Sequence, residues 1–254
     1  MRILALHAHP DDVEILAGGT MALLARAGHH VTFATMTSGD CGSAEFDAAA
    51  IAAMRGEEAR RAAGVIGAHY EWIGFNDLAI FNDDPSRRRV TAFLRRLRPE
   101  IVITAAPIDY HCDHEATSIL VRDACFGVSA PNYDCSGFGG AAPLDGIPHL
   151  YFMDSAASAD RDGRMVRPDF LVDVAAAFPA KREMLACHES QRAWLRKQHG
   201  MDDFLETMEQ WTRRRGALAG VTFAEGFRQY HGHPYPESPL LQQLLGDLVI
   251  LPAG

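Results

Sequence analysis

The chain begins with the apolar run Ile3-Leu4-Ala5-Leu6, which leads into the polar stretch His7-Ala8-His9-Pro10-Asp11-Asp12-Val13-Glu14. A short apolar run that ends in polar loop residues is typical of a buried β-strand. Residues 20–27 then have the composition of a helix, and Gly28 is a typical residue at which a helix ends. The first thirty residues are therefore predicted to form a strand, a loop and a helix, and this unit decides the fold.

The same order of strand and helix repeats along the next hundred residues. Further strands are predicted at residues 31–36, 70–73 and 101–104, and helices at residues 49–63, 86–97 and 115–125. Alternating strands and helices with short connections are typical of a parallel sheet that is covered on both faces. We therefore expect an α/β fold, a Rossmann-like three-layer sandwich whose sheet is mainly parallel and has helices on both faces.

The second half of the chain is less regular. Residues 128–148 are rich in Gly, Pro, Ser and Asn, which indicates a long loop or lid that would wall the substrate pocket. Beyond this loop, strands are predicted at residues 149–153 and 170–174, and helices at residues 175–198 and 203–214. The last helix has an apolar stripe, which is typical of a core, with a subunit interface as the alternative. We expect a single domain over residues 1–254 and a homo-oligomer.

The composition limits the class of protein. The chain has 254 residues, 48% of them hydrophobic and 22% charged, as in ordinary soluble globular proteins. The net charge of −9 disfavours a nucleic-acid partner. Five cysteines without a CxxC pair are expected to be reduced thiols. No stretch has the pattern of a signal peptide or a membrane span, so we expect no membrane partner and a cytoplasmic location.

Two clusters of imidazole and carboxylate groups follow predicted strands. The first begins directly after Leu6, and the second is Asp109-Tyr110-His111-Cys112-Asp113-His114, shortly after the strand at 101–104. In open α/β sheets, ligands bind at the carboxyl ends of the strands. We therefore expect the two clusters to meet on one rim of the sheet.

The residue types in these clusters are those of an open metal site. Two neutral histidines and one carboxylate make a common zinc shell, which leaves a position for water and lowers its pKa to about 7. His9, Asp12 and His114 have suitable spacing. The adjacent Asp11 and Asp12 can supply one ligand and one base, because successive residues point in different directions. The alternative is that both aspartates cap the next helix and that the histidines are ordinary loop residues.

The stretch His9-Pro10-Asp11-Asp12-Val13-Glu14 with Gly18-Gly19-Thr20, together with His111-Cys112-Asp113-His114, closely resembles the LmbE-like, or PIG-L, family of zinc-dependent N-acetylglucosaminyl deacetylases. The resemblance extends to four further segments, namely Arg55-Gly56-Glu57-Glu58-Ala59, Gly74-Phe75-Asn76-Asp77, Lys181 with His188-Glu189-Ser190-Gln191, and Ala224-Glu225-Gly226-Phe227. It covers most of the chain, to about residue 230.

The resemblance implies a role for each matching residue. The ligands of a Zn²⁺ ion, or of Fe²⁺ or another divalent metal, would be His9, Asp12 and His114. Asp11 would be the general base, and His111 would polarise the carbonyl or protonate the leaving amine. Asp113 is expected to orient His111, since a neighbouring carboxylate fixes the tautomer of an imidazole.

Three further residues are expected at the substrate. Arg55 matches a position that contacts the sugar, and His188 is expected to reach the site from a late helix. Some family members have an oxyanion-stabilising tyrosine where this chain has Asp109, and Tyr110 is the candidate substitute. Cys112 stands where the family usually has proline, which is a second departure from the pattern.

We therefore expect an enzyme whose partner is a small-molecule amino sugar. It would hydrolyse the N-acetyl group of an N-acetylglucosamine-type sugar or glycoconjugate by means of zinc-activated water. One alternative is an amidase of sugar-thiol conjugates in the same family, and another is a non-catalytic metal-binding or carbohydrate-binding protein. The presence of both Asp11 and His111 favours the enzyme, because a binding protein needs ligands but neither an acid nor a base.

Overall fold

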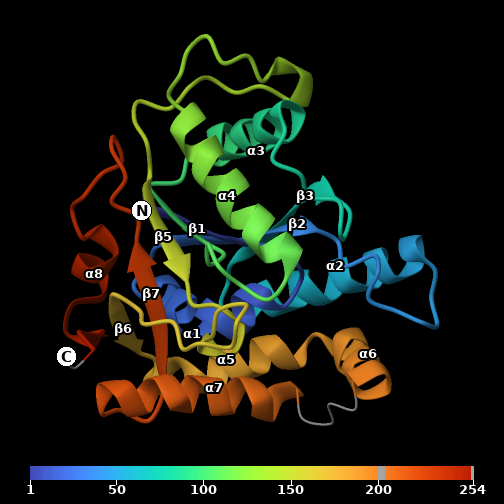
Figure 1. Cartoon of the computed structure of the whole chain (residues 1–254), viewed down its shortest axis with the longest axis vertical. Coiled ribbons are helices and arrows are strands. Elements are labelled where there is room, and N and C mark those ends of the chain that lie inside the picture. Colours follow the sequence, from blue (N-terminus) through green and yellow to red (C-terminus); the bar gives the residue numbers. More distant parts are fainter. Residues whose placement is uncertain (200–203, 253–254) are drawn as a thin grey trace.

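The computed structural model describes residues 1–199 and 204–252. Among these residues, eight strands form one sheet with the order β3-β2-β1-β4-β5-β7-β6-β8 (Figure 1). The strands are β1 (Arg2–His7), β2 (His30–Thr37), β3 (His69–Phe75), β4 (Ile101–Thr104), β5 (His149–Met153), β6 (Phe170–Asp173), β7 (Ala224–Gln229) and β8 (Val249–Ile250). The five strands from β3 to β5 are parallel, whereas β7 is antiparallel to both of its neighbours and β8 is antiparallel to β6. The predicted α/β fold with a mainly parallel sheet is confirmed.

Helices cover both faces of this sheet (Figure 1). They are α1 (Asp12–Arg26), α2 (Ala48–Gly64), α3 (Asp84–Leu97), α4 (Cys112–Gly127), α5 (Phe178–Ala186), α6 (Glu189–His199), α7 (Phe204–Ala219) and α8 (Leu240–Leu245). Because side chains alternate along a strand, β1 contributes to two separate cores. Ile3 and Ala5 pack with α1, α2, α5 and α8, while Leu4 and Leu6 pack with α3 and α4.

Several boundaries differ from the predicted ones. Helix α1 begins at Asp12 rather than at residue 20, so acidic residues of the first motif lie in its first turn, where the helix dipole favours them. The helix predicted over 175–198 is interrupted at His188, whose side chain is buried. Strand β7 was not predicted because its sequence, AEGFRQ, combines glycine with charged residues. Asp203, the expected first residue of the last helix, lies outside the described residues.

The loop at residues 128–148 lies at the amino ends of the parallel strands, whereas the predicted rim lies at their carboxyl ends. Helix α4 carries the chain from the carboxyl end of β4 to the amino end of β5, where the loop begins. Arg95 of α3 fastens it through hydrogen bonds to the carbonyl oxygens of Val128, Ala130 and Tyr133. Its last part lines a cavity with Arg2, at the amino end of β1. The loop therefore does not wall the rim at which the two motifs meet.

Two other expectations concern helices and thiols. The apolar stripe of α7 is part of a core, as expected, because Phe204 and Met208 pack with Phe178 and Leu185 of α5. The five cysteines are free thiols. Within the described ranges, the helices are too short or too polar to cross a membrane.

A buried ion pair joins α1 to the C-terminal half of the chain. Lys181 Nζ lies 2.5 Å from Glu225 Oε1 and donates a hydrogen bond of 2.7 Å to the Ile15 carbonyl oxygen. The same glutamate accepts hydrogen bonds of 2.8 and 2.7 Å from the backbone N–H groups of Gly19 and Thr20. These side chains therefore bind backbone groups in the middle of α1, and they fix the helix that carries the first motif.

Replacement of Glu225 is expected to destabilise the fold strongly. Glu225→Ala leaves the Lys181 ammonium buried without its partner, so the free energy of unfolding should fall by about 3–5 kcal/mol. Glu209→Ala is the matched control, because it removes the 2.8 Å ion pair to Arg213 on the surface, and a change below about 1 kcal/mol is expected. Urea denaturation measures both values, and similar losses in the two variants would contradict a special role for the buried pair.

Candidate functional site

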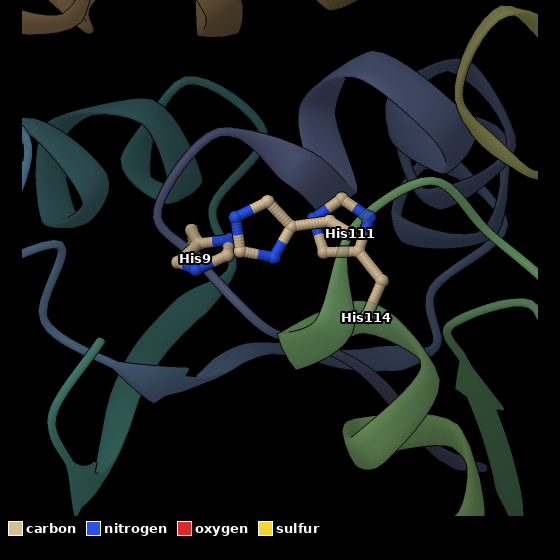
Figure 2. A group of neighbouring side chains, drawn as sticks. All are labelled: His9, His111 and His114. Atoms are coloured by element: carbon tan, nitrogen blue, oxygen red, sulfur yellow. The ribbon is translucent and has the colours of Figure 1, made fainter. Parts of the chain in front are cut away.

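The two motifs meet at the carboxyl ends of β1 and β4, which are parallel neighbours with Leu6 opposite Thr104. The first motif forms the turn into α1, and the second forms the turn into α4. His111 caps α4, because its Nδ1 accepts a hydrogen bond of 3.2 Å from the backbone N–H of Asp113. Figure 2 shows the rings of His9, His111 and His114 gathered between the two turns. The predicted rim is therefore where the chemistry-bearing residues lie.

The Asp12 carboxylate lies at the centre of this group. Its Oδ2 atom lies 2.7 Å from His7 Nδ1, 3.4 Å from His9 Nδ1 and 3.5 Å from His114 Nε2. It also accepts a hydrogen bond of 2.8 Å from the His9 backbone N–H. Burial opposes the charge of Asp12, but His7 and His114 outweigh it and hold its pKa well below the ordinary value. Asp12 is therefore an ionised carboxylate beside three imidazoles.

Two overlapping sets of donor atoms could hold a metal ion. One set is His9, His111 and His114, and the other is His7, Asp12 and His114; within each set the donor atoms lie within 4.8 Å of one another. Of the predicted ligands, His9 belongs to the first set, Asp12 to the second and His114 to both. All three lie on the same rim of the sheet. Imidazole nitrogen and carboxylate oxygen are donors that suit zinc and other divalent transition metals. The buried His7 Nε2 has no hydrogen-bond partner in the described structure.

The Asp113 carboxylate contacts His9 rather than His111. Its Oδ2 lies 3.2 Å from His9 Nε2 and accepts a hydrogen bond of 2.7 Å from the Leu78 backbone N–H. The Asp113 carboxylate is therefore not hydrogen-bonded to His111, and Asp113 contacts that ring through its backbone N–H, which donates to His111 Nδ1. Burial disfavours a charged His9, but the contacts with Asp113 and Asp12 prevail and raise its pKa to about 10. A cation bound to His9 has to displace a proton at neutral pH.

Asp11 has surroundings that differ from those of Asp12. It precedes α1 with φ 104° and ψ −26°, a left-handed conformation that is uncommon for residues other than glycine and often marks functional sites. Its carboxylate is buried and lies 3.7 Å from Arg55 Nη2. Burial raises the pKa of Asp11 to about 7, with Arg55 opposing and Asp12 adding to the rise. The surroundings thus favour the ionised form of Asp12 and disfavour that of Asp11. This difference suits a metal ligand and a general base, respectively.

Arg55 forms part of the wall beneath Asp11. Its guanidinium is buried and donates a hydrogen bond of 2.7 Å to the Pro10 carbonyl oxygen. Gly39 has φ +75°, and a Cβ atom there would lie 2.5 Å from the Arg55 guanidinium, so a side chain at this position would displace it. Arg55 also lines the larger cavity at the site, and its Nε has no hydrogen-bond partner among the described residues.

His188 lies behind the site rather than in it. Its ring is fully buried, and its Nε2 lies 3.0 Å from Glu14 Oε1. It does not line either of the cavities that contain Asp11. The expected contact between His188 and a substrate is therefore wrong, because Glu14 in the first turn of α1 engages the ring in the interior.

Two supporting residues were not assigned a role from the sequence. Asp109 Oδ1 lies 3.0 Å from His114 Nδ1, and its Oδ2 accepts a hydrogen bond of 3.1 Å from the Ala156 N–H. Asp109 therefore fixes the ring of a predicted ligand, as neighbouring carboxylates do at metal sites. His7 supports Asp12 in the same manner. The only signal in the sequence is that each lies in the same short motif as the residue that it supports.

Two cavities open from this group of residues. The larger has a volume of about 680 Å³, within the usual range for small-molecule sites, and His9, Asp77 and His111 contribute to its walls. The smaller has a volume of about 130 Å³. Asp11, Asp12, Tyr110 and His114 line both cavities. Tyr110, predicted at the substrate, is 69% exposed at their entrance.

The raised pKa of Asp11 predicts a dependence of stability on pH in the metal-free protein. Because the pKa is higher in the folded chain, the stabilising contribution is complete below the ordinary value of 3.8 and is lost as the pH rises through about 7. Chelator-treated wild type should therefore lose stability relative to Asp11→Asn between pH 4 and pH 8. Urea titrations across this range test it, and parallel profiles for the two proteins would contradict the raised pKa.

Comparisons with known proteins find a matching family model and several relatives. Residues 4–125 match the family model described as PIG-L, GlcNAc-PI de-N-acetylase. The chain is 27% identical over 237 residues to diacetylchitobiose deacetylase of Thermococcus kodakarensis, covering 89% of this chain and 82% of the relative. It is 26% identical over 196 residues to 4-oxalmesaconate hydratase of Pseudomonas putida, covering 74% and 73%.

A solved structure has a similar fold over most of the chain. N,N'-diacetylchitobiose deacetylase from Pyrococcus horikoshii superposes with a TM-score of 0.75 at 23% identity, covering 94% of this chain and 88% of that one. The family match includes both motifs, from Leu4 to Cys125. The resemblance found in the sequence is thus confirmed, because the segment that carries the site matches the PIG-L, or LmbE-like, family model.

Proposed function

We propose that the chain is a metal-dependent hydrolase that removes the N-acetyl group from an N-acetylglucosamine-type amino sugar or glycoconjugate. The observation that carries the proposal is the pair of adjacent aspartates. Asp12 is an ionised carboxylate between imidazoles, while Asp11 is held apart from it beside Arg55. The named activity of the Thermococcus kodakarensis relative supports the same reaction.

The ligands that we propose for the metal are His9, Asp12 and His114, with Zn²⁺ as the ion and Fe²⁺ or another divalent metal as the alternative. This donor set fits the ion, because Asp12 Oδ2 lies within 3.5 Å of a nitrogen of each histidine. When bound, such an ion acts as a Lewis acid and lowers the pKa of water. Asp113 and Asp109 orient the two histidines through their contacts.

The residues beside the ligands supply the proton transfers. Asp11 takes a proton from water as the water oxygen attacks the amide carbon, and its raised pKa suits a base that works near neutral pH. His111 lies at the same rim and donates a hydrogen bond to the carbonyl oxygen or a proton to the leaving nitrogen. The carbon–nitrogen bond breaks, and the products are acetate and a free amine. Arg55 and Tyr110 are the proposed substrate contacts.

The cytoplasmic location, the homo-oligomer and the single-domain organisation expected from the sequence stay predictions.

An assay of the metal-loaded protein tests the proposed reaction directly. Release of a primary amine and acetate from N-acetylglucosamine, diacetylchitobiose or an N-acetylglucosaminyl-inositol is the expected result. A protein that leaves all three intact but hydrates 4-oxalmesaconate, the reaction named for the Pseudomonas putida relative, would contradict the proposal.

Substitution of the two aspartates is expected to have different effects. Asp11→Asn should retain the metal and reduce kcat by about 10²–10⁴, the usual contribution of a general base. Asp12→Asn should lose the metal, because it removes the carboxylate between the imidazoles. Elemental analysis of both purified variants beside the wild type measures this difference. Equal metal contents would show that the roles of the two neighbours are assigned wrongly.

Substitution of His111 is expected to reduce the rate and to change the pH profile. His111→Gln should retain the metal and lower kcat by about 10²–10⁴. Burial, His9 and His114 lower the pKa of His111 below 6.5, so any limb of the wild-type profile that reports its imidazolium should be missing in the variant. Profiles of kcat against pH for both proteins test this. If the variant keeps the full wild-type profile, the proton-transfer role belongs to another residue.

A further inference from the structure

The two cavities adjoin each other at the site and share the residues that would surround a reacting amide. Asp11, Asp12 and His114 lie at their junction. An amide carbon placed at this junction has its nitrogen substituent on one side and its acyl chain on the other. The volume and the lining residues of each cavity therefore indicate which half of a substrate it binds.

The residues that line only one of the two cavities differ in polarity, whereas Leu195, Trp211 and six other residues line both cavities. The larger cavity has charged and polar groups along its wall, from His9, Cys41, Asp77, His111 and Asp160. The residues that line only the smaller cavity are Ile15, Leu16, Phe204, Met208 and Thr207, and all of these except Thr207 are apolar. Sugar hydroxyls lose free energy when they are buried without hydrogen-bond partners, whereas alkyl groups gain it among apolar walls. The sugar therefore fits the larger cavity, and an alkyl or aryl group fits the smaller one.

The smaller cavity is larger than an acetyl group requires. Its volume of about 130 Å³ is close to the roughly 150 Å³ of an apolar protein cavity that binds benzene, whereas a single water molecule occupies about 30 Å³. The methyl group of an acetamide would leave most of this space unfilled. Leu16, Phe204 and Met208 are buried members of the wall, so the space belongs to the packed interior at α1 and α7.

A polar atom without a partner lies at the same junction. Gln191 lines both cavities, and its Oε1 atom is buried without a hydrogen-bond partner in the described structure. A buried acceptor without a donor is costly, so such an atom points to a donor that arrives with a ligand. The N–H group of an amide that spans the two cavities is a donor of this kind.

We infer that the smaller cavity binds the acyl group, and that the chain hydrolyses amino sugars whose N-acyl group is longer than acetyl, with about four to six carbons. This inference rests on the proposed function and specifies its substrate class. Water adds across the amide as before, so a short-chain carboxylate leaves instead of acetate, and the amine takes up the proton. Gln191 then accepts the hydrogen bond of the amide N–H.

A series of glucosamines that differ only in the acyl group tests the inference. The metal-loaded wild type is assayed with N-acetyl-, N-butanoyl-, N-hexanoyl- and N-decanoylglucosamine, with release of the amine as the readout. Each methylene that enters the cavity should improve kcat/KM by up to about fourfold, and the decanoyl chain should be poor because it exceeds the cavity. A kcat/KM for N-butanoylglucosamine tenfold below that for N-acetylglucosamine would overturn the inference and leave the proposed function standing.

A cavity-filling variant tests the location of the acyl group. Thr207 lines the smaller cavity but not the larger one, so Thr207→Phe should lower kcat/KM for N-hexanoylglucosamine at least tenfold more than it lowers kcat/KM for N-acetylglucosamine. Glu206→Phe is the matched control, because it places the same side chain at the next, exposed position of α7. Circular dichroism checks that both variants are folded. Equal effects of Thr207→Phe on the two substrates would overturn the inference.

A binding measurement separates this inference from the proposed function. If no N-acylglucosamine is hydrolysed, the proposed reaction is wrong, and calorimetric titration with the same compounds decides the role of the cavity. Binding of N-hexanoylglucosamine at least tenfold tighter than N-acetylglucosamine, lost in Thr207→Phe but not in Glu206→Phe, would support it. Equal affinities in the wild type would overturn it.

Discussion

The arrangement of the site depends on one carboxylate oxygen, Oδ2 of Asp12, which faces three imidazole rings. The rings come from two strand–helix units that are adjacent only because β1 and β4 are parallel neighbours in the sheet. Asp12 begins α1 and His114 lies in the first turn of α4, so each contact between them also joins two helices on opposite faces of the sheet. The ionised Asp12 carboxylate therefore contributes a negative charge to the site and also holds α1 and α4 together.

Neighbouring aspartates in this site have opposite electrostatic surroundings. Three imidazoles stabilise the charge of Asp12, and the carboxylate remains ionised. Asp11 has one guanidinium at 3.7 Å and little contact with water, so burial prevails and its pKa rises. The difference arises because Asp11 adopts a left-handed backbone conformation before the helix begins, whereas Asp12 is helical. A change of backbone direction within one residue thus separates two carboxylates that have the same chemistry in solution.

Much of the fold and of the site could be predicted from the sequence, because strands such as β4 are continuous apolar runs and because both motifs follow such strands. The sequence did not indicate the partners that come from distant parts of the chain. Asp113 contacts His9 through a loop geometry that involves Leu78, and the ring of His188 turns inward to Glu14, 174 residues away. Strand β7 lacks an apolar pattern, because its residue Glu225 is buried and accepts a hydrogen bond from a backbone N–H group in the middle of α1. Contacts of this kind are set by tertiary packing, which no local pattern encodes.

The attachment of α1 to Glu225 has a consequence for the modularity of the chain. The segment that matches the family model ends at residue 125 and contains both motifs. Yet the N–H groups of Gly19 and Thr20, in the helix that begins with Asp12, bond to a glutamate a further hundred residues along the chain. Excision of the matched segment would leave these groups, and the apolar faces covered by α5, in contact with water. The segment that matches the family model is therefore not an autonomous folding unit, and recombination or truncation within this framework has to keep β7 together with α1.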